Sequence, residues 1–154
     1  MADPPLTSRR VLVTGATGLL GPYLVDALAV VGPVTTTARR GGDIRCDLTD
    51  ADDVARLLAS ARPEVVVHTA ALTDVDACQQ DPDRAALLNE GTVVHLVGVL
   101  PPGTTFVQVS TDQVYPDTPG PHREGTEDPV NVYGRTKLAG ERAALASDGA
   151  LVLR

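Results

Sequence analysis

Short apolar runs alternate along this chain with longer segments in which apolar residues recur every three or four positions. The short runs predict buried strands, and the longer segments predict helices that pack on those strands. The expected strands cover residues 11–13, 34–38, 65–67, 106–110 and 151–153, with a short further segment at 44–46. The expected helices cover residues 20–31, a segment capped by Thr49 or Asp50 and closed by Pro63, residues 75–100 with an interruption near Asp81-Pro82, and residues 131–146. This alternation predicts an α/β fold with a doubly wound parallel sheet.

Length and composition place this sheet in one domain. The chain has 154 residues, which suffices for one good core but not for two ordinary domains. We expect a flexible tail at residues 1–9, one domain at residues 10–154, and a surface loop rich in Pro, Gly and acids at residues 116–129. The formal net charge of -7 leaves no basic stripe for phosphates and argues against a nucleic-acid partner.

The two cysteines and the N-terminus carry no sign of secretion. Cys46 and Cys78 form neither a C-x-x-C motif nor a cluster with histidines, so we interpret both as ordinary cytosolic thiols and expect no metal site. Residues 1–5 include an acid and two prolines rather than an apolar signal region, and no run is long enough to cross a membrane. The prediction is a cytoplasmic protein.

Three glycines follow the first expected strand at intervals of three, namely Gly15, Gly18 and Gly21. A strand that leads through a glycine turn into a helix N-terminus makes an anion site, because backbone N–H groups and the helix dipole point at a phosphate. Gly15 suits the tight turn, Gly18 leaves room for a pyrophosphate, and Gly21 lets the helix lie close on the sheet. By itself the spacing is equally compatible with purely structural glycines.

A second candidate site lies near the start of the helix at residues 131–146. Tyr133 and Lys137 are four residues apart and therefore share one helix face. An ammonium group near a phenol stabilises the phenolate, so we expect Lys137 to lower the pKa of Tyr133 toward the range useful for acid–base chemistry. Ser110 and Thr111 end the preceding strand and can offer a hydroxyl to a substrate oxygen. A surface Tyr and Lys on an amphipathic helix is the alternative.

The order of these motifs resembles the extended short-chain dehydrogenase/reductase family from about residue 11 to residue 154. The matching motifs are Thr-Gly-Ala-Thr-Gly-Leu-Leu-Gly at 14–21, Cys-Asp-Leu at 46–48, His-Thr-Ala-Ala at 68–71, Val-Ser-Thr-Asp at 109–112 and Tyr-Gly-Arg-Thr-Lys-Leu-Ala-Gly-Glu at 133–141. Within the family the chain looks most like the dTDP-4-dehydrorhamnose reductase branch. The resemblance implies a Rossmann-like, NAD(P)-binding domain at residues 10–154, without the family's C-terminal substrate domain.

The resemblance also implies residue roles. Tyr133 would be the general acid that protonates a carbonyl oxygen, Lys137 would tune Tyr133 and hold the nicotinamide ribose, and Thr111 would hydrogen-bond the same carbonyl oxygen. Asn89 would order the site, or would simply be a helix-interior amide bonded to backbone. The cofactor would be bound by Gly15, Thr17, Gly18, Leu20, Gly21, Asp47, Leu48, Ala70, Ala71, Tyr133 and Lys137.

The end of the second strand bears on the choice of cofactor. In this fold an acid at that place binds the adenosine ribose and repels a 2′-phosphate. Here the place holds Arg39 and Arg40, whose charge and forked donors suit a phosphate. We therefore predict NADP(H), with NAD(H) as the alternative cofactor and a solvated turn as the alternative role of the two arginines.

These features lead to a primary functional expectation, an oxidoreductase that reduces a 4-keto nucleotide sugar in dTDP-rhamnose biosynthesis. A 4-epimerase shares the Thr, Tyr and Lys set, whereas a 4,6-dehydratase is disfavoured because Gln113 stands where dehydratases carry a glutamate. A non-catalytic regulatory subunit is a further alternative, because the β subunit of methionine adenosyltransferase resembles the same branch. The partners expected are a nucleotide sugar and a second copy or complementing chain.

Overall fold

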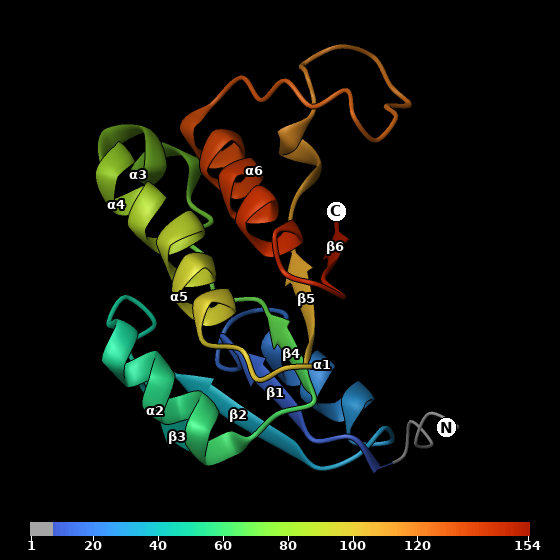
Figure 1. Cartoon of the computed structure of the whole chain (residues 1–154). Helices are drawn as coiled ribbons and strands as arrows, with labels where there is room; N and C mark the ends of the chain where they lie inside the picture. Colours follow the sequence, from blue (N-terminus) through green and yellow to red (C-terminus); the bar gives the residue numbers. More distant parts are fainter. Residues whose placement is uncertain (1–7) are drawn as a thin grey trace.

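The computed structural model describes residues 8–154, which form a six-stranded parallel sheet with helices on both faces (Figure 1). The strand order is β3-β2-β1-β4-β5-β6, so the predicted doubly wound, Rossmann-like sheet is confirmed. Residues 1–7 of the expected tail lie outside the described residues, whereas the backbone of Arg9 packs closely against Gly32. The strands are β1 (Val11–Thr14), β2 (Val34–Ala38), β3 (Ile44–Arg45), β4 (Val65–His68), β5 (Thr105–Val109) and β6 (Leu151–Leu153).

The helices follow the predicted segments with shorter bounds. They are α1 (Gly21–Leu28), α2 (Ala51–Ala61), α3 (Val75–Gln80), α4 (Pro82–Ala86), the π-helical turn η2 (Leu87–Gly91), α5 (Thr92–Gly98), the 3-10 turn η3 (Asp112–Val114) and α6 (Val132–Leu145). The predicted interruption is confirmed at Asp81, whose carboxylate accepts from the backbone N–H of Arg84 and caps α4. Asp50, one of the two expected caps, caps α2. The π-helical turn was not predicted.

Two apolar layers hold the helices to the sheet. On one face, Leu12, Val66 and Phe106 pack under α2, α5 and α6 and form the larger core. On the other face, α1 packs on Val13 and Val67, and it lies behind the sheet in Figure 1. This division follows from the pleat, because alternate residues of a strand point to opposite faces.

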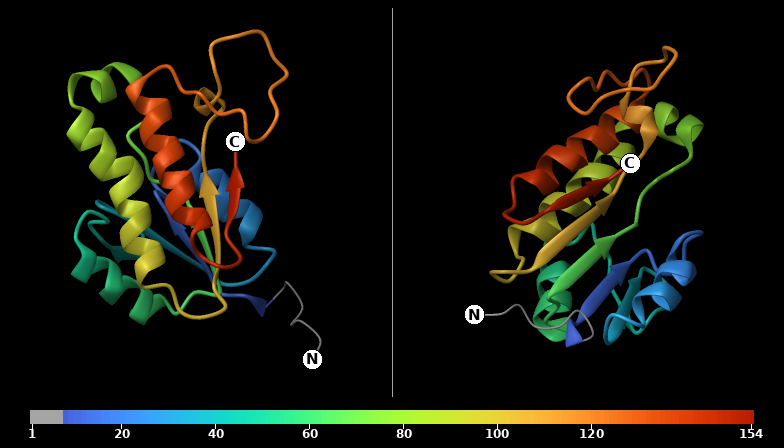
Figure 2. Two further views of the ribbon diagram at one scale, coloured as in Figure 1. Left: turned by 45° about the horizontal axis from the view of Figure 1, so that its top comes forward. Right: turned by 90° about the vertical axis from the view of Figure 1, so that its right-hand side faces the viewer.

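All six strands run the same way, so their carboxyl ends share one edge of the sheet. Figure 2 shows the arrowheads of β5 and β6 pointing toward the end that holds the loop at residues 116–129 and the C-terminus. Ligands of open parallel sheets bind beyond this edge. Within residues 8–154, no helix is long and apolar enough to cross a membrane.

Candidate functional site

The glycine turn after β1 is fixed by close backbone approaches. Gly15 has a φ of 69°, and a Cβ at this position would lie 2.7 Å from the backbone nitrogen of Ala70. A Cβ on Gly21 would overlap the carbonyl group of Ala16. Both glycines are therefore required by the fold, and together they bring the start of α1 against the turn and the loop after β4.

A cavity of about 630 Å³ lies at the carboxyl edge, between the glycine turn and α6. Of the residues predicted to bind the cofactor, eleven line it: Gly15, Thr17, Gly18, Leu20, Arg39, Asp47, Leu48, Ala70, Ala71, Tyr133 and Lys137. Gly21, Arg40 and Thr111 are not among the lining residues. Gly21 lies beneath the turn, which leaves it a packing role. Arg39 is the arginine of the pair that faces the cavity.

A row of buried polar side chains crosses the sheet at this edge. The register places Thr14 beside Thr37 on one side and beside His68 on the other, and His68 beside Gln108. The hydroxyl of Thr14 lies 2.7 Å from Nδ1 of His68. Burial, aided by the nearby charge of Lys137, lowers the pKa of His68 to about 3, so the ring is neutral near pH 7.

Tyr133 and Lys137 come from the first turns of α6, whose N-terminus Asn131 caps by accepting from the Gly134 N–H at 2.7 Å. Both side chains line the cavity and both are buried, with exposures of 8% and 3%. Lys137 Nζ donates to the carbonyl oxygen of Val109 over 2.7 Å. Burial lowers the pKa of Lys137 to about 8, and the carboxylate of Glu141 opposes that shift.

The expected lowering of the Tyr133 pKa is wrong. Burial of the phenol raises its pKa, and the hydrogen bond with Thr111 only partly offsets this. The physical reason is that burial shields the phenol from solvent, which disfavours the phenolate, while the ammonium of Lys137 donates to the carbonyl of Val109. Tyr133 is therefore protonated near pH 7, which is the form that a general acid requires and a general base does not.

Thr111 lies between two residues that line different cavities. Its neighbour Ser110 lines the large cavity, and its other neighbour Asp112 lines a second cavity of about 410 Å³. The Thr111 hydroxyl accepts from the backbone N–H of Gln113 at 3.2 Å and hydrogen-bonds Tyr133. Thr111 thus reaches the site through Tyr133 rather than from the wall of the large cavity.

Asn89 acts on the loop that follows β4. Its side chain is 1% exposed, accepts from the Leu72 N–H at 2.7 Å, and donates to the Leu72 carbonyl and to the Thr136 hydroxyl, each at 3.1 Å. It therefore connects the loop that contains Ala70 and Leu72 to α6. Of the two alternatives given by the sequence, these contacts match the amide bonded to backbone, and the role of Asn89 in ordering the site stays a prediction.

At the other end of the cavity, Arg39 directly after β2 and Asp47 shortly after β3 carry opposite charges. Thr49 donates to the Asp47 carboxylate from both its N–H and its hydroxyl, and these bonds lower the pKa of Asp47. The charge of Arg39 adds to this lowering. Cys46 is a free, buried thiol whose pKa is raised by burial to about 12, so it is unreactive.

The wall of the cavity fits a dinucleotide. Side chains of Asp or Asn cap α2, α3, α4 and α6, but α1 starts at the glycine turn without a side-chain cap and without an acid in its first turn. An uncapped helix start that faces a cavity suits a pyrophosphate. Thr37 also lines the cavity, and its buried hydroxyl has no hydrogen-bond partner among the described residues.

Several lining residues were not assigned a role in the site from the sequence, although some belong to the motifs quoted above. They are Leu19, Thr37, Ala38, Cys46, Thr49, Thr69, Leu72, Thr73, Arg84, Leu88, Thr92 and Val109. Most are either the last residues of a strand or follow one within about five residues, so position at a strand end was the available signal. Arg84, Leu88 and Thr92 are spaced by four, which places them on one side of the α4–α5 segment, but nothing in the sequence told which side faces the cavity.

Fold and site together define a Rossmann-like protein with a ligand cavity at the carboxyl edge of its sheet. The family model described as "RmlD substrate binding domain" matches residues 9–154, and the chain belongs to this family. The resemblance to the dTDP-4-dehydrorhamnose reductase branch is thereby confirmed.

The individual relatives include proteins with two different names. The chain is 37% identical over 147 residues to dTDP-4-dehydrorhamnose reductase of Mycolicibacterium smegmatis, covering 91% of this chain and 42% of the relative. It is also 37% identical over 163 residues to methionine adenosyltransferase 2 subunit beta of Xenopus tropicalis, covering 99% of this chain and 48% of the relative. The chain spans about half the length of these relatives.

A solved structure agrees in fold. The dTDP-4-dehydrorhamnose reductase of Bacillus anthracis, in complex with NADP, superposes with a TM-score of 0.85 at 27% identity. The match covers 95% of this chain and 52% of that chain.

Proposed function

We propose that this chain is the cofactor-binding and proton-donating part of an NADPH-dependent reductase acting on a 4-keto nucleotide sugar. One observation carries the proposal: a single cavity is lined by the glycine turn at one end and by Tyr133 and Lys137 at the other. The relatives named dTDP-4-dehydrorhamnose reductase support it, as does the NADP complex of one such protein.

Each group of the site has a task in this reaction. NADPH, when bound, supplies a hydride. The uncapped start of α1 and Gly18 hold the pyrophosphate, and Arg39 binds the 2′-phosphate. Tyr133, kept protonated by its burial, donates its proton to the carbonyl oxygen of the sugar. The hydroxyl of Thr111 orients that phenol, and Lys137 fixes the end of β5 through Val109.

A regulatory subunit is the second candidate. The observation that favours it is the 37% identity to methionine adenosyltransferase 2 subunit beta, which extends over 99% of this chain. In that case the cavity would still bind a dinucleotide, but Tyr133 would have no turnover to support.

The two candidates are separated by hydride transfer. The absorbance of NADPH is followed with a 4-keto nucleotide sugar in wild-type protein and in Tyr133→Phe, with NADPH affinity measured by fluorescence quenching. Tyr23→Phe is the matched control, because Tyr23 is 72% exposed and lies outside the cavity. The reductase proposal expects turnover that Tyr133→Phe abolishes with affinity retained. NADPH binding without any Tyr133-dependent turnover would favour the regulatory subunit.

A further inference from the structure

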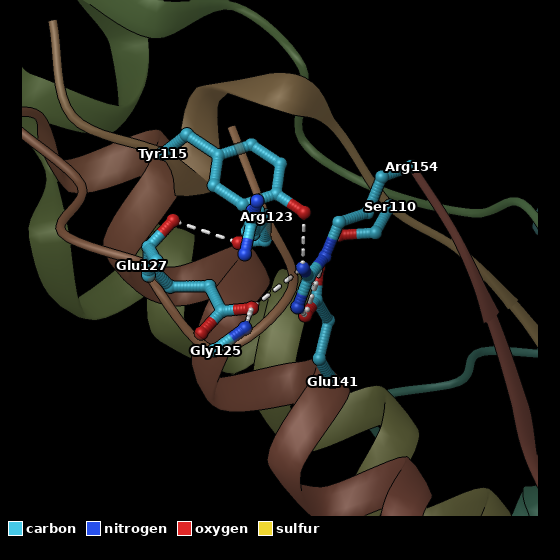
Figure 3. Close-up of polar contacts among 8 residues, drawn as sticks. Ser110, Tyr115, Arg123, Gly125, Glu127, Glu141 and Arg154 are labelled. Carbon is cyan, nitrogen blue, oxygen red and sulfur yellow. Dashed lines mark hydrogen bonds and ion pairs between the residues drawn. The ribbon is translucent and has the colours of Figure 1, made fainter. Parts of the chain in front are cut away.

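Glu141 is a buried carboxylate in α6 that the proposed reaction does not use. It is 1% exposed, and both of its oxygens are occupied (Figure 3). The guanidinium of Arg154 donates to it from Nη2 at 2.6 Å and from Nε at 3.1 Å and 3.2 Å. The hydroxyl of Ser110 donates to the same carboxylate. A buried charge with this many partners is fixed in place.

Three residues of α6 contact three consecutive residues, namely the last residue of β5 and the two that follow it. Tyr133, Lys137 and Glu141 are spaced by four and lie on one face of the helix. Lys137 bonds the carbonyl oxygen of Val109, Glu141 bonds the hydroxyl of Ser110, and Tyr133 bonds Thr111. Glu141 therefore makes the last of three side-chain hydrogen bonds that hold α6 to the segment at the end of β5.

Glu141 also sets the charge near the amine of Lys137. The titratable groups that interact electrostatically with that amine are Glu141 on α6 and His68 on β4. Tyr133 lines the same cavity, and burial keeps both Tyr133 and His68 neutral near pH 7. Glu141 is the group whose charge favours the protonated amine, against the effect of burial. Without that carboxylate, burial would act on Lys137 unopposed.

Arg154 joins this pair to the loop at residues 116–129. Its Nη1 lies 2.6 Å from the Glu127 carboxylate and donates to the Tyr115 hydroxyl at 2.6 Å, and its guanidinium lies 5.0 Å from the centre of the Tyr115 ring. Figure 3 shows Glu127 and Glu141 on either side of this guanidinium. Arg154 thus retains a partner if Glu141 loses its charge.

We propose that Glu141, held by Arg154, is a positioning residue that fixes the Ser110–Thr111 segment directly after β5 and supplies a buried negative charge on the helix face that carries Lys137. Its consequence for turnover rests on the proposed reductase function. Its effect on Lys137 does not, because the charge of that amine is measurable without any reaction.

The experiment uses the fact that Lys137 is the only lysine of the sequence. Protein labelled with ¹³C-lysine therefore gives one ε-carbon resonance for the side chain, and we expect its pH titration in wild type to have a midpoint near pH 8. We expect a lower midpoint in Glu141→Gln. Glu127→Gln is the matched control, since Glu127 also pairs with Arg154 but does not touch Ser110, and it should keep the wild-type midpoint.

Equal midpoints in wild type and Glu141→Gln would overturn the proposal, and so would an equal shift in Glu127→Gln. If Glu141→Gln fails to fold, the double variant Glu141→Gln with Arg154→Gln leaves neither charge buried alone, and the same lower midpoint is expected. NADPH binding is measured in parallel by fluorescence quenching. Absence of NADPH binding together with a lowered midpoint would count against the reductase function and leave the positioning role of Glu141 intact.

Discussion

Thr14 and His68 lie side by side in β1 and β4, and the Thr14 hydroxyl is 2.7 Å from Nδ1 of the His68 ring. On its other side, Nε2 of His68 is 3.4 Å from the Thr92 hydroxyl. The ring is fully buried beneath α5 and packs against Phe106 with 6.0 Å between ring centres. These contacts suit an uncharged imidazole. Because protonation of the buried ring is unfavourable, the stability of the folded protein depends on pH.

We expect acid to destabilise the protein partly through His68. The native pKa is about 3 and the ordinary value 6.5, so between these pH values the unfolded chain binds a proton that the native ring does not. The free energy of unfolding therefore falls as pH falls through this window, with His68 contributing a slope of up to about 1.4 kcal/mol per pH unit. Urea denaturation from pH 7 to pH 4 measures the slope. His68→Asn should show a shallower slope, His122→Asn the wild-type slope, and equal slopes in all three would contradict the assignment.

The second prediction concerns the close approach at Gly21. Gly21→Ala places a methyl group against the Ala16 carbonyl, so α1 must move away from the turn. We expect a loss of about 1–3 kcal/mol in the free energy of unfolding, seen as a lower midpoint in thermal denaturation. Gly98→Ala is the control, because a methyl group there meets no atom within 4 Å, and it should change stability by less than about 1 kcal/mol. Equal effects of the two substitutions would show that Gly21 is not constrained.

Local patterns were sufficient to predict the fold. Runs such as Val65 to Val67 marked strands, and the glycines at 15 and 21 proved to sit where a side chain cannot fit. The Asp81 interruption could be read because an acid before proline is a local capping signal. By contrast, the π-helical turn at Leu87–Gly91 surrounds Asn89, whose partners Leu72 and Thr136 lie 17 and 47 residues away. No local pattern reports such contacts.

The site was predicted less completely than the fold, for the same reason. Spacing placed Tyr133 and Lys137 on one face, but it did not show that the phenol would be buried, and burial raises the pKa of Tyr133. The amine of Lys137 donates instead to the carbonyl of Val109. Arg39 and Arg40 are equivalent in sequence, and only the direction of the backbone after β2 distinguishes the one that lines the cavity.

The choice of cofactor supplies the third prediction. Arg39 faces the cavity close enough to Asp47 to lower the pKa of that carboxyl group. If Arg39 binds a 2′-phosphate, Arg39→Ala should weaken NADPH binding by about tenfold or more and leave NADH binding nearly unchanged. Fluorescence titration with both dinucleotides measures the two affinities. Arg40→Ala, which removes the same charge outside the cavity, should retain most of the NADPH preference; a larger effect at Arg40 than at Arg39 would reverse the assignment.

The last prediction tests the link that Asn89 makes between the loop after β4 and α6. Asn89→Ala removes three hydrogen bonds, leaves the Leu72 N–H without its side-chain acceptor, and leaves the Leu72 carbonyl with only the weak donor of the Cys78 thiol. The loss should cost about 2–4 kcal/mol of unfolding free energy. Because the same loop carries Ala70 and Ala71 at the cavity wall, NADPH affinity should fall as well. Gln79→Ala removes an amide from an exposed position of α3 and should leave both quantities unchanged. Denaturant unfolding and NADPH titration measure them, and a destabilised Asn89→Ala protein with wild-type affinity would separate the packing of the loop from the shape of the cavity.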